Sequence, residues 1–83
     1  MSLNSREIDV VNIIVQAYIQ HAVPVGSRYV AKQSGLGLSP ASMRNVMADL
    51  TDKGYLTQPY TSAGRIPTQK AFRFYVDSML KPG

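Results

Sequence analysis

The sequence contains no cysteine and a single histidine, His21, among its 83 residues. Without cysteine the chain has no disulfide, no thiolate metal site and no cysteine nucleophile, and this composition is typical of a reducing compartment. No carboxylate cluster surrounds His21 in the sequence, and there is no glycine-rich phosphate loop, nucleophile motif or metal-ligand spacing. We therefore expect a protein that is not an enzyme and that needs neither a cofactor nor a metal.

Long apolar runs are also missing. No run approaches the roughly 20 residues of a membrane-spanning helix, and the N-terminus lacks the apolar core of a secretion signal. We therefore expect a cytoplasmic protein without membrane contact. A chain of this length forms one domain at most and buries only about 60% of the surface that its unfolded form exposes. We expect a small stability margin and no deep enclosed active-site cavity.

Acidic residues are absent from two long stretches, 10–48 and 53–76, although the chain carries five of them. The net charge is +4, and both stretches contain basic residues. Such segregation of charge is typical of a surface that binds a polyanion. From charge alone, an ordinary solvated basic surface is the alternative. The basic residues in the two stretches are Arg28, Lys32, Arg44, Lys53, Arg65, Lys70 and Arg73.

Hydrophobic spacing predicts a first helix from Ser5 to His21, with Asn4 as its N-cap and Glu7 three residues later closing a capping box. This helix is apolar on two sides, so both sides must be covered. We expect the last helix of the chain to cover the second side. The first side comprises Ile8, Val11, Val15, Tyr18 and Ile19, and the second comprises Val10, Ile13 and Ala17.

Two further helices follow, separated by a turn that contains glycine. The second helix is short, with Ser27 as its expected N-cap and Gly35 as its left-handed stop. The third helix has the clearest start in the sequence, because Ser39 is an N-cap residue and Pro40 occupies the first helical position. Gly54 ends this helix. Its expected core-facing residues are Met43, Val46, Met47 and Leu50.

A β-hairpin is predicted directly after the third helix. Its first strand covers residues 55–58, its turn covers 61–64, and a short return strand at 65–66 is ended by Pro67. A last helix follows over residues 69–80. This helix is expected to have Thr68 as its cap and Phe72, Tyr75, Val76 and Met79 as its core-facing stripe.

This order of elements is mainly α with a small β-hairpin. It predicts a winged helix-turn-helix in a single domain over residues 1–83: a three-helix core, a short wing and a C-terminal helix. We expect the third helix to enter the major groove of DNA, because its outward face is small at Ala41 and Ala48 and polar around Arg44. The wing is expected on the DNA backbone or in the minor groove. The candidate DNA-binding residues are Ser27, Arg28, Tyr29, Lys32, Ser39, Ala41, Ser42, Arg44, Asn45, Thr61, Ser62 and Arg65.

Several alternatives stay open at this point. The sequence does not separate residues that contact bases from residues that contact phosphates. Arg65 has an ion pair with Asp49 or Asp52 as its alternative to DNA contact. For the whole domain the alternative is a winged-helix module for protein–protein contacts. Such a module would use the second apolar side of the first helix together with Phe72, Phe74 and Tyr75.

Several blocks of the sequence resemble the N-terminal DNA-binding domain of HrcA, the bacterial heat-inducible transcription repressor. The blocks are Pro24–Ser27, Leu38–Leu50, Thr61–Thr68 and Arg73–Asp77, in that order. The Thr-Ser-Ala-Gly-Arg-Ile-Pro-Thr block at Thr61–Thr68 is the most distinctive of HrcA. The resemblance extends over nearly the whole chain.

The resemblance implies a repressor of chaperone operons that binds an inverted-repeat operator, the CIRCE element, as a homodimer, with the chaperonin GroEL promoting its active form. It also implies that Ser39–Leu50 is the recognition helix and Thr61–Thr68 the wing. HrcA proteins are several times longer, so the resemblance identifies this chain as a fragment of a longer repressor. Ser42 and Met43 stand where a Thr-Ile pair is usual, and Tyr60 where histidine is usual. These departures affect the expected base preference rather than the fold.

Overall fold

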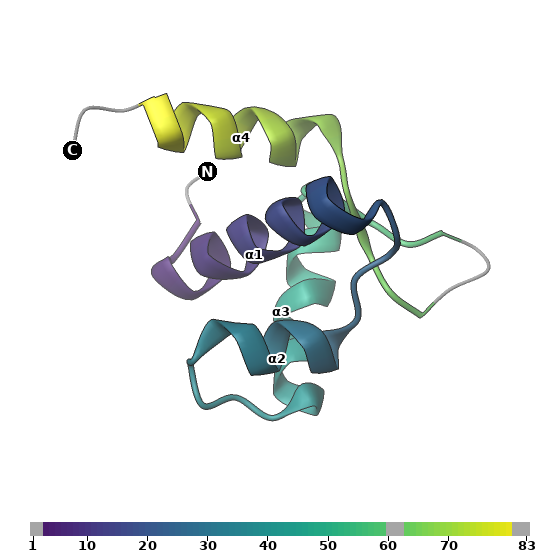
Figure 1. Cartoon of the computed structure of the whole chain (residues 1–83). Helices are drawn as coiled ribbons and strands as arrows, with labels where there is room; N and C mark the ends of the chain where they lie inside the picture. Colours follow the sequence, from purple (N-terminus) through teal and green to yellow (C-terminus); the bar gives the residue numbers. More distant parts are fainter. Residues whose placement is uncertain (1–2, 60–62, 81–83) are drawn as a thin grey trace.

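The computed structural model describes residues 3–59 and 63–80 of the chain. α1 lies in the middle, with α4 along one side and α2 along the other, while α3 crosses behind them and the hairpin projects from one end (Figure 1). This arrangement is a winged helix-turn-helix, as the sequence predicted. The elements are α1 (Ser5–His21), α2 (Ser27–Ser34), α3 (Pro40–Asp52), β1 (Leu56–Thr57), β2 (Ile66–Pro67) and α4 (Gln69–Leu80).

The core forms where the first three helices meet the hairpin. Ile14 of α1, Val30 of α2, Met43 and Leu50 of α3, and Leu56 of β1 are all at most 2% exposed. Met43 and Leu50 lie seven residues apart, which places them on the same face of α3, two turns from each other. Burial of these side chains fixes the rotation of α3 about its axis, so its opposite face is held in one orientation.

Side-chain caps set the starts of α1 and α3. Asn4 Oδ1 accepts a hydrogen bond from the Glu7 amide at 2.8 Å, and the Glu7 carboxylate accepts one from the Asn4 amide at 3.1 Å. The predicted capping box is therefore confirmed. Ser39 Oγ accepts a hydrogen bond from the Ser42 amide at 3.1 Å, and Pro40 follows in the first turn of α3, as predicted.

The predicted N-cap of α2 is wrong. Gly26 is the N-cap, in an extended conformation, and Ser27 is the first residue inside the helix. The cause is long-range, because Val25 pairs with Arg65 in an antiparallel bridge and keeps the chain extended up to Gly26. The predicted stop is confirmed: Gly35 has φ of 65°, the left-handed conformation that glycine adopts without strain.

The strands β1 and β2 pair antiparallel, with Leu56 opposite Pro67 and Thr57 opposite Ile66. The return strand was predicted at 65–66 and ended by Pro67; β2 does end at Pro67, but it begins at Ile66 and includes the proline as its last residue. A proline is tolerated in this position because β2 is an edge strand, where one missing N–H donor costs the ladder little.

α4 packs on the first apolar side of α1. The rings of Tyr18 and Phe72 meet edge to face with their centroids 6.3 Å apart, and the Gln16 amide donates to the Tyr75 hydroxyl at 3.4 Å. The prediction that α4 covers the second side is therefore wrong.

The second apolar side of α1 faces α2 instead. Ile13 and Ala17 lie beside Tyr29 and Gln33 of α2. Ala22 ends α1 in the left-handed conformation, with φ of 56°, before the connection that leads to α2.

Only part of the stripe predicted on α4 contacts the core. Phe72 and Tyr75 are half-buried, whereas Val76 and Met79 are 48% and 67% exposed. Ala71 is the fully buried residue of α4. The predicted inward stripe is therefore correct for Phe72 and Tyr75 and wrong for Val76 and Met79.

Candidate nucleic-acid interface

The outward face of α3 is free of covering side chains. Ala41, Ser42, Arg44, Asn45 and Ala48 are all exposed. Buried residues on the opposite face anchor the helix, so these five positions form a rigid surface two to three turns long. Two of them are alanines, which lets another surface approach the helix backbone closely.

The start of α3 is organised by hydroxyl groups. Ser39 is exposed and uses its Oγ to cap the Ser42 amide. The Ser39 hydroxyl also donates to Ser42 Oγ at 3.2 Å. This pair presents polar groups at the positive end of the helix dipole, an environment that favours an anion.

The sequence-predicted residues of α2 divide between two sides of that helix. Arg28 and Lys32 are exposed and lie four residues apart, hence on one face. Ser27 is half-buried and lies beside Arg28 where α2 begins. Tyr29 is different, because it lies against Ala17 on the α1 side of α2. The structure therefore brings Ser27 and Arg28 beside Arg44 of α3, keeps Lys32 on the same face of α2 as Arg28, and places Tyr29 elsewhere.

A groove of about 360 Å³ runs between the start of α2, the outward side of α3 and the base of the hairpin. Three arginines from three different segments line it, and none of the described lining residues is acidic. Such a groove has a positive potential and suits a phosphate group. Its lining residues are Gly26, Ser27, Arg28, Arg44, Met47, Gln58, Ala63, Gly64 and Arg65.

Arg65 lies at the base of the hairpin, not at its tip, and is half-buried. Its Nη1 donates to the Ala63 carbonyl at 2.7 Å and to the Gly64 carbonyl at 3.3 Å, and its Nε donates to Thr51 Oγ1 at 3.4 Å. The predicted alternative, an ion pair with Asp49 or Asp52, is not the arrangement found among the described residues.

Some residues of this interface were not predicted from the sequence. Gln58 and Ala63 line the groove, and Thr51 contacts Arg65, but each of these residue types is common on ordinary surfaces. The predicted wing was the one signal that pointed to Gln58 and Ala63, and nothing in the sequence singled out Thr51 in α3. The two other predicted wing residues, Thr61 and Ser62, lie outside the described residues.

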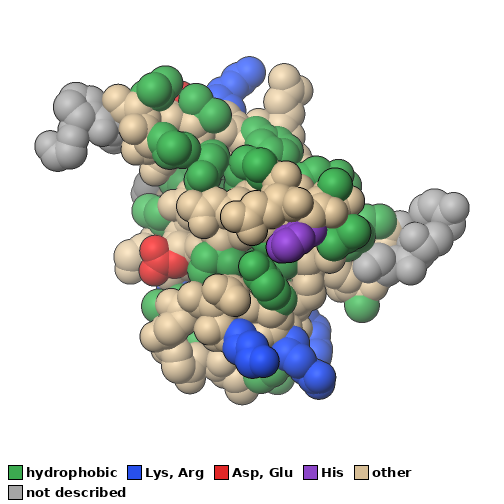
Figure 2. All heavy atoms as spheres, in the orientation of Figure 1, with side chains coloured by type: hydrophobic (Ala, Val, Ile, Leu, Met, Phe, Trp, Pro, Cys, Tyr) green, Lys and Arg blue, Asp and Glu red, His purple; other side chains and the backbone are tan. Residues whose placement is uncertain are grey.

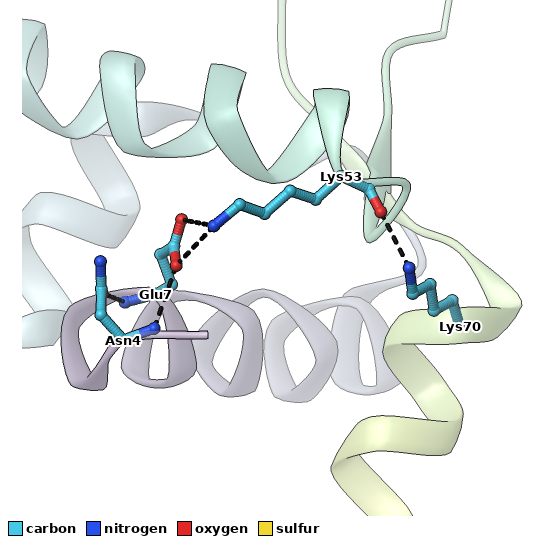
Figure 3. Close-up of polar contacts among 4 residues, drawn as sticks. All are labelled: Asn4, Glu7, Lys53 and Lys70. Carbon is cyan, nitrogen blue, oxygen red and sulfur yellow. Dashed lines mark hydrogen bonds and ion pairs between the residues drawn. The ribbon is translucent and has the colours of Figure 1, made fainter. Parts of the chain in front are cut away.

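Two basic residues of the acid-poor stretches have internal partners. Lys53 Nζ lies 2.9 and 2.8 Å from the two carboxylate oxygens of Glu7 (Figure 3). Lys70 donates to the Lys53 carbonyl at 3.0 Å and lies over the Tyr55 ring, 4.6 Å from its centroid. Both lysines therefore help to hold α1, α3 and α4 together. The basic residues that line the groove are arginines.

On the face drawn in Figure 2, most of the basic and most of the apolar side chains lie over different elements. In Figure 2, basic side chains gather over α2, while apolar side chains follow α1 and α4. The aromatic residues considered for protein contact, Phe72, Phe74 and Tyr75, are half-buried. The Phe74 ring packs edge to face on Tyr55 with centroids 5.9 Å apart. These rings therefore serve largely to attach α4.

No helix within residues 3–59 and 63–80 combines the length and the apolar character needed to cross a bilayer.

Comparisons with known proteins identify similar chains. The chain is 64% identical over 80 residues to the heat-inducible transcription repressor HrcA of Nitratidesulfovibrio vulgaris strain DP4, covering 96% of this chain and 22% of that protein. It is 61% identical over 79 residues to HrcA of Chlorobium phaeobacteroides strain DSM 266, covering 95% and 22%. A crystal structure of a hypothetical protein matches with a TM-score of 0.88 and 47% identity, over 94% of this chain and 25% of that one. No protein-family profile matches the chain. The chain spans about a fifth of the length of the curated relatives that it matches.

Proposed function

We propose that this chain, which is homologous to the N-terminal region of the HrcA heat-inducible transcription repressors, is a sequence-specific DNA-binding domain. The observation that carries the proposal is the exposed outward face of α3, small at Ala41 and Ala48 and polar at Arg44 and Asn45. An α-helix fits the major groove of B-DNA, where each base pair presents a distinct pattern of donors and acceptors.

Base recognition is assigned to the first two turns of α3. Arg44 has a planar guanidinium that matches the O6 and N7 atoms of guanine, and the Asn45 amide matches the N6 and N7 atoms of adenine. Ser39 and Ser42 supply hydroxyl groups beside them. Ala41 lets the helix backbone approach the bases.

Backbone contact is assigned to the groove between α2, α3 and the hairpin. Arg28 lines the groove and Lys32 lies on the same face of α2, so both can neutralise phosphates along one strand. Ser27 adds a hydroxyl where α2 begins. Phosphate contacts set the register of α3 on the duplex and carry no sequence information themselves.

A fluorescence-anisotropy titration tests the proposal. It compares a half-site duplex, a full inverted repeat and a scrambled duplex of equal length across a range of salt concentrations. Log affinity should fall against log salt by about 0.9 for each phosphate neutralised, and the inverted repeat should bind more tightly than the scrambled duplex. Equal binding to all three duplexes, or binding that ignores salt, would contradict the proposal.

Arg44→Ala separates the two kinds of contact that this residue could make. If Arg44 reads a base, the substitution costs about 1–3 kcal/mol on the cognate duplex and relaxes the preference at one base pair. Arg73→Ala is the matched control, because Arg73 is exposed on α4, on the other side of α1 from α2. An equal loss on all sequences would identify Arg44 as a phosphate contact instead.

For the longer protein, we extend the proposal to repression of heat-shock chaperone operons. An inverted-repeat operator has two-fold symmetry, so two copies of this domain are needed, one for each half-site. The full-length protein is therefore proposed to act as a homodimer, with GroEL as the partner that promotes its active form.

A further inference from the structure

Arg65 connects three parts of the chain that are far apart in sequence. Its backbone pairs with Val25, in the connection between α1 and α2, through hydrogen bonds of 2.8 and 2.9 Å. Its side chain reaches Thr51 in the last turn of α3 and the Ala63 carbonyl in the hairpin. One residue therefore sets where the hairpin leaves the helical body.

The contact with α3 is directional. Thr51 Oγ1 donates its proton to the Met47 carbonyl at 2.8 Å, so its lone pairs are left to accept from Arg65 Nε at 3.4 Å. Met47 lies on the wall of the basic groove. The chain of hydrogen bonds thus ties the base of the hairpin to the helix that carries the DNA-contacting face.

Close packing adds to the constraint. A Cβ atom at Gly64 would lie 3.0 Å from Pro24 Cβ and 3.1 Å from the Val25 amide nitrogen. The hairpin backbone therefore sits directly on the connection between α1 and α2, with no room for a side chain in between.

We propose that Arg65 is a positioning residue for the DNA-binding surface, holding the hairpin at a fixed angle to α3, and that it acts through Thr51, Ala63 and Val25 rather than by contact with DNA. The inference rests on the proposed function. It refines the sequence-based prediction, in which Arg65 binds DNA directly. Lysine cannot replace arginine in this role, because a single ammonium group cannot reproduce the planar fork that reaches a hydroxyl and two carbonyls together.

Four variants of the chain test the proposal: Arg65→Lys, Arg65→Ala, Thr51→Val and Thr51→Ser. Amide hydrogen exchange is measured first, without DNA, at Val25 and Arg65, the two amides of the bridge. Arg65→Lys, Arg65→Ala and Thr51→Val should each speed exchange at these two amides by roughly three- to tenfold, the worth of one or two hydrogen bonds. Thr51→Ser keeps the acceptor and should restore the wild-type rates. Exchange at Ile14, in the core, reports global unfolding, so a larger increase in rate at Val25 and Arg65 than at Ile14 separates the local effect from general destabilisation.

DNA binding is measured next, by titration with the inverted-repeat duplex across salt concentrations. Arg65→Lys and Arg65→Ala should weaken binding equally, and the uncharged change Thr51→Val should weaken it by roughly three- to tenfold as well. Arg73→Lys is the matched control: it makes the same exchange on α4, outside the residues that line the groove, and should bind within about twofold of wild type.

Two results would overturn the proposal. If Arg65→Lys binds like wild type while Arg65→Ala lowers the salt slope by about 0.9, Arg65 is a phosphate contact. If exchange at Val25 and Arg65 is the same in every variant, the junction does not hold the hairpin. Failure of the wild-type chain to prefer the inverted repeat would instead refute the proposed function, and the exchange experiment would still decide the role of the junction.

Discussion

Glu7 closes the start of α1 and pairs with Lys53 at the end of α3. Among the described residues it is the one charged side chain that is buried, with 5% of its surface exposed. The hydrogen bonds from Lys53 lower the pKa of the Glu7 carboxyl, and the Asn4 amide lowers it further, against the opposing effect of burial. Because the pair joins residues 46 positions apart, it stabilises tertiary structure rather than a single helix.

Glu7→Gln should lower the free energy of unfolding by about 2 kcal/mol, because the charged hydrogen bonds to Lys53 are lost. Glutamine can still accept from the Asn4 amide, so the capping box is kept and the ion pair is tested on its own. Chemical denaturation at neutral pH measures the change. Arg6→Gln, at an exposed neighbouring position, is the control and should unfold like wild type.

The same pair predicts a pH dependence. The pKa of Glu7 in the folded chain lies below its ordinary value of 4.5, so the unfolded chain binds more protons in acid. The stabilisation is complete above about pH 4.5 and is lost as the pH falls through the lowered pKa of the folded state. Denaturation curves of wild type and Glu7→Gln should therefore converge in acid. A difference that stays constant down to pH 2 would contradict this assignment.

Gly64→Ala should destabilise the chain by about 1–3 kcal/mol, because the new methyl group would press on the backbone of Pro24 and Val25. Gly26→Ala is the control without a steric clash, since nothing lies within 4 Å of the position of its Cβ; it should cost only the poorer capping of alanine at the start of α2. Thermal unfolding of the two variants measures the difference. Equal melting temperatures would show that the backbone at Gly64 can move away from Pro24 and Val25 to make room for a methyl group.

At the scale of elements, α3 has one face that anchors it in the core and an opposite face that is proposed to contact DNA. Met43, Met47 and Leu50 are buried, while Ala41 and Ala48 on the other face are exposed. Stability and DNA affinity should therefore respond to different substitutions in the same helix.

Ala41→Glu should weaken DNA binding by about tenfold or more while leaving stability unchanged or slightly raised. A carboxylate in the first turn interacts favourably with the helix dipole but repels phosphates nearby. Gln69→Glu makes the same change of charge in the first turn of α4 and should bind DNA nearly as wild type does. Titrations at one salt concentration, with melting curves of both variants, check the prediction. Equal losses in the two variants would show that only net charge matters.

Elements with local signals were predicted well. Asn4 and Ser39 are capping residues next to periodic apolar positions, and both helices begin where these residues predict. The start of α2 was missed because pairing of Val25 with Arg65 extends the chain to Gly26. Val25 and Arg65 are 40 positions apart in the sequence, and no pattern of neighbouring residues predicts that they pair.

At the scale of the whole molecule, α4 is the least embedded helix. Its one buried residue is Ala71, and its last turns expose Val76, Met79 and Leu80 by 48%, 67% and 76%. In Figure 1 this end of α4 extends past the rest of the helical body. Few apolar contacts hold it to the core.

We expect the amides of residues 76–80 to exchange with solvent through local fraying, at opening free energies far below that of global unfolding. Amides in the middle of α1, such as those of Ile14 and Val15, should exchange only through global unfolding. Native-state hydrogen exchange under increasing denaturant separates the two regimes. Protection of residues 76–80 equal to that of Ile14 would contradict the expectation.

The sequence by itself determined where most helices begin, which face of α3 is buried and that a hairpin follows, because caps, periodicity and turn residues act over a few positions. Only the tertiary structure decided that Arg28, Arg44 and Arg65 share one groove and that Glu7 neutralises Lys53. The tertiary structure also decided that Tyr29 lies against α1 and that α4 packs on the first apolar side of α1. Contacts of this kind form between segments that are far apart in the sequence. They depend on how those segments pack, and burial of the whole core supplies the free energy that stabilises this packing.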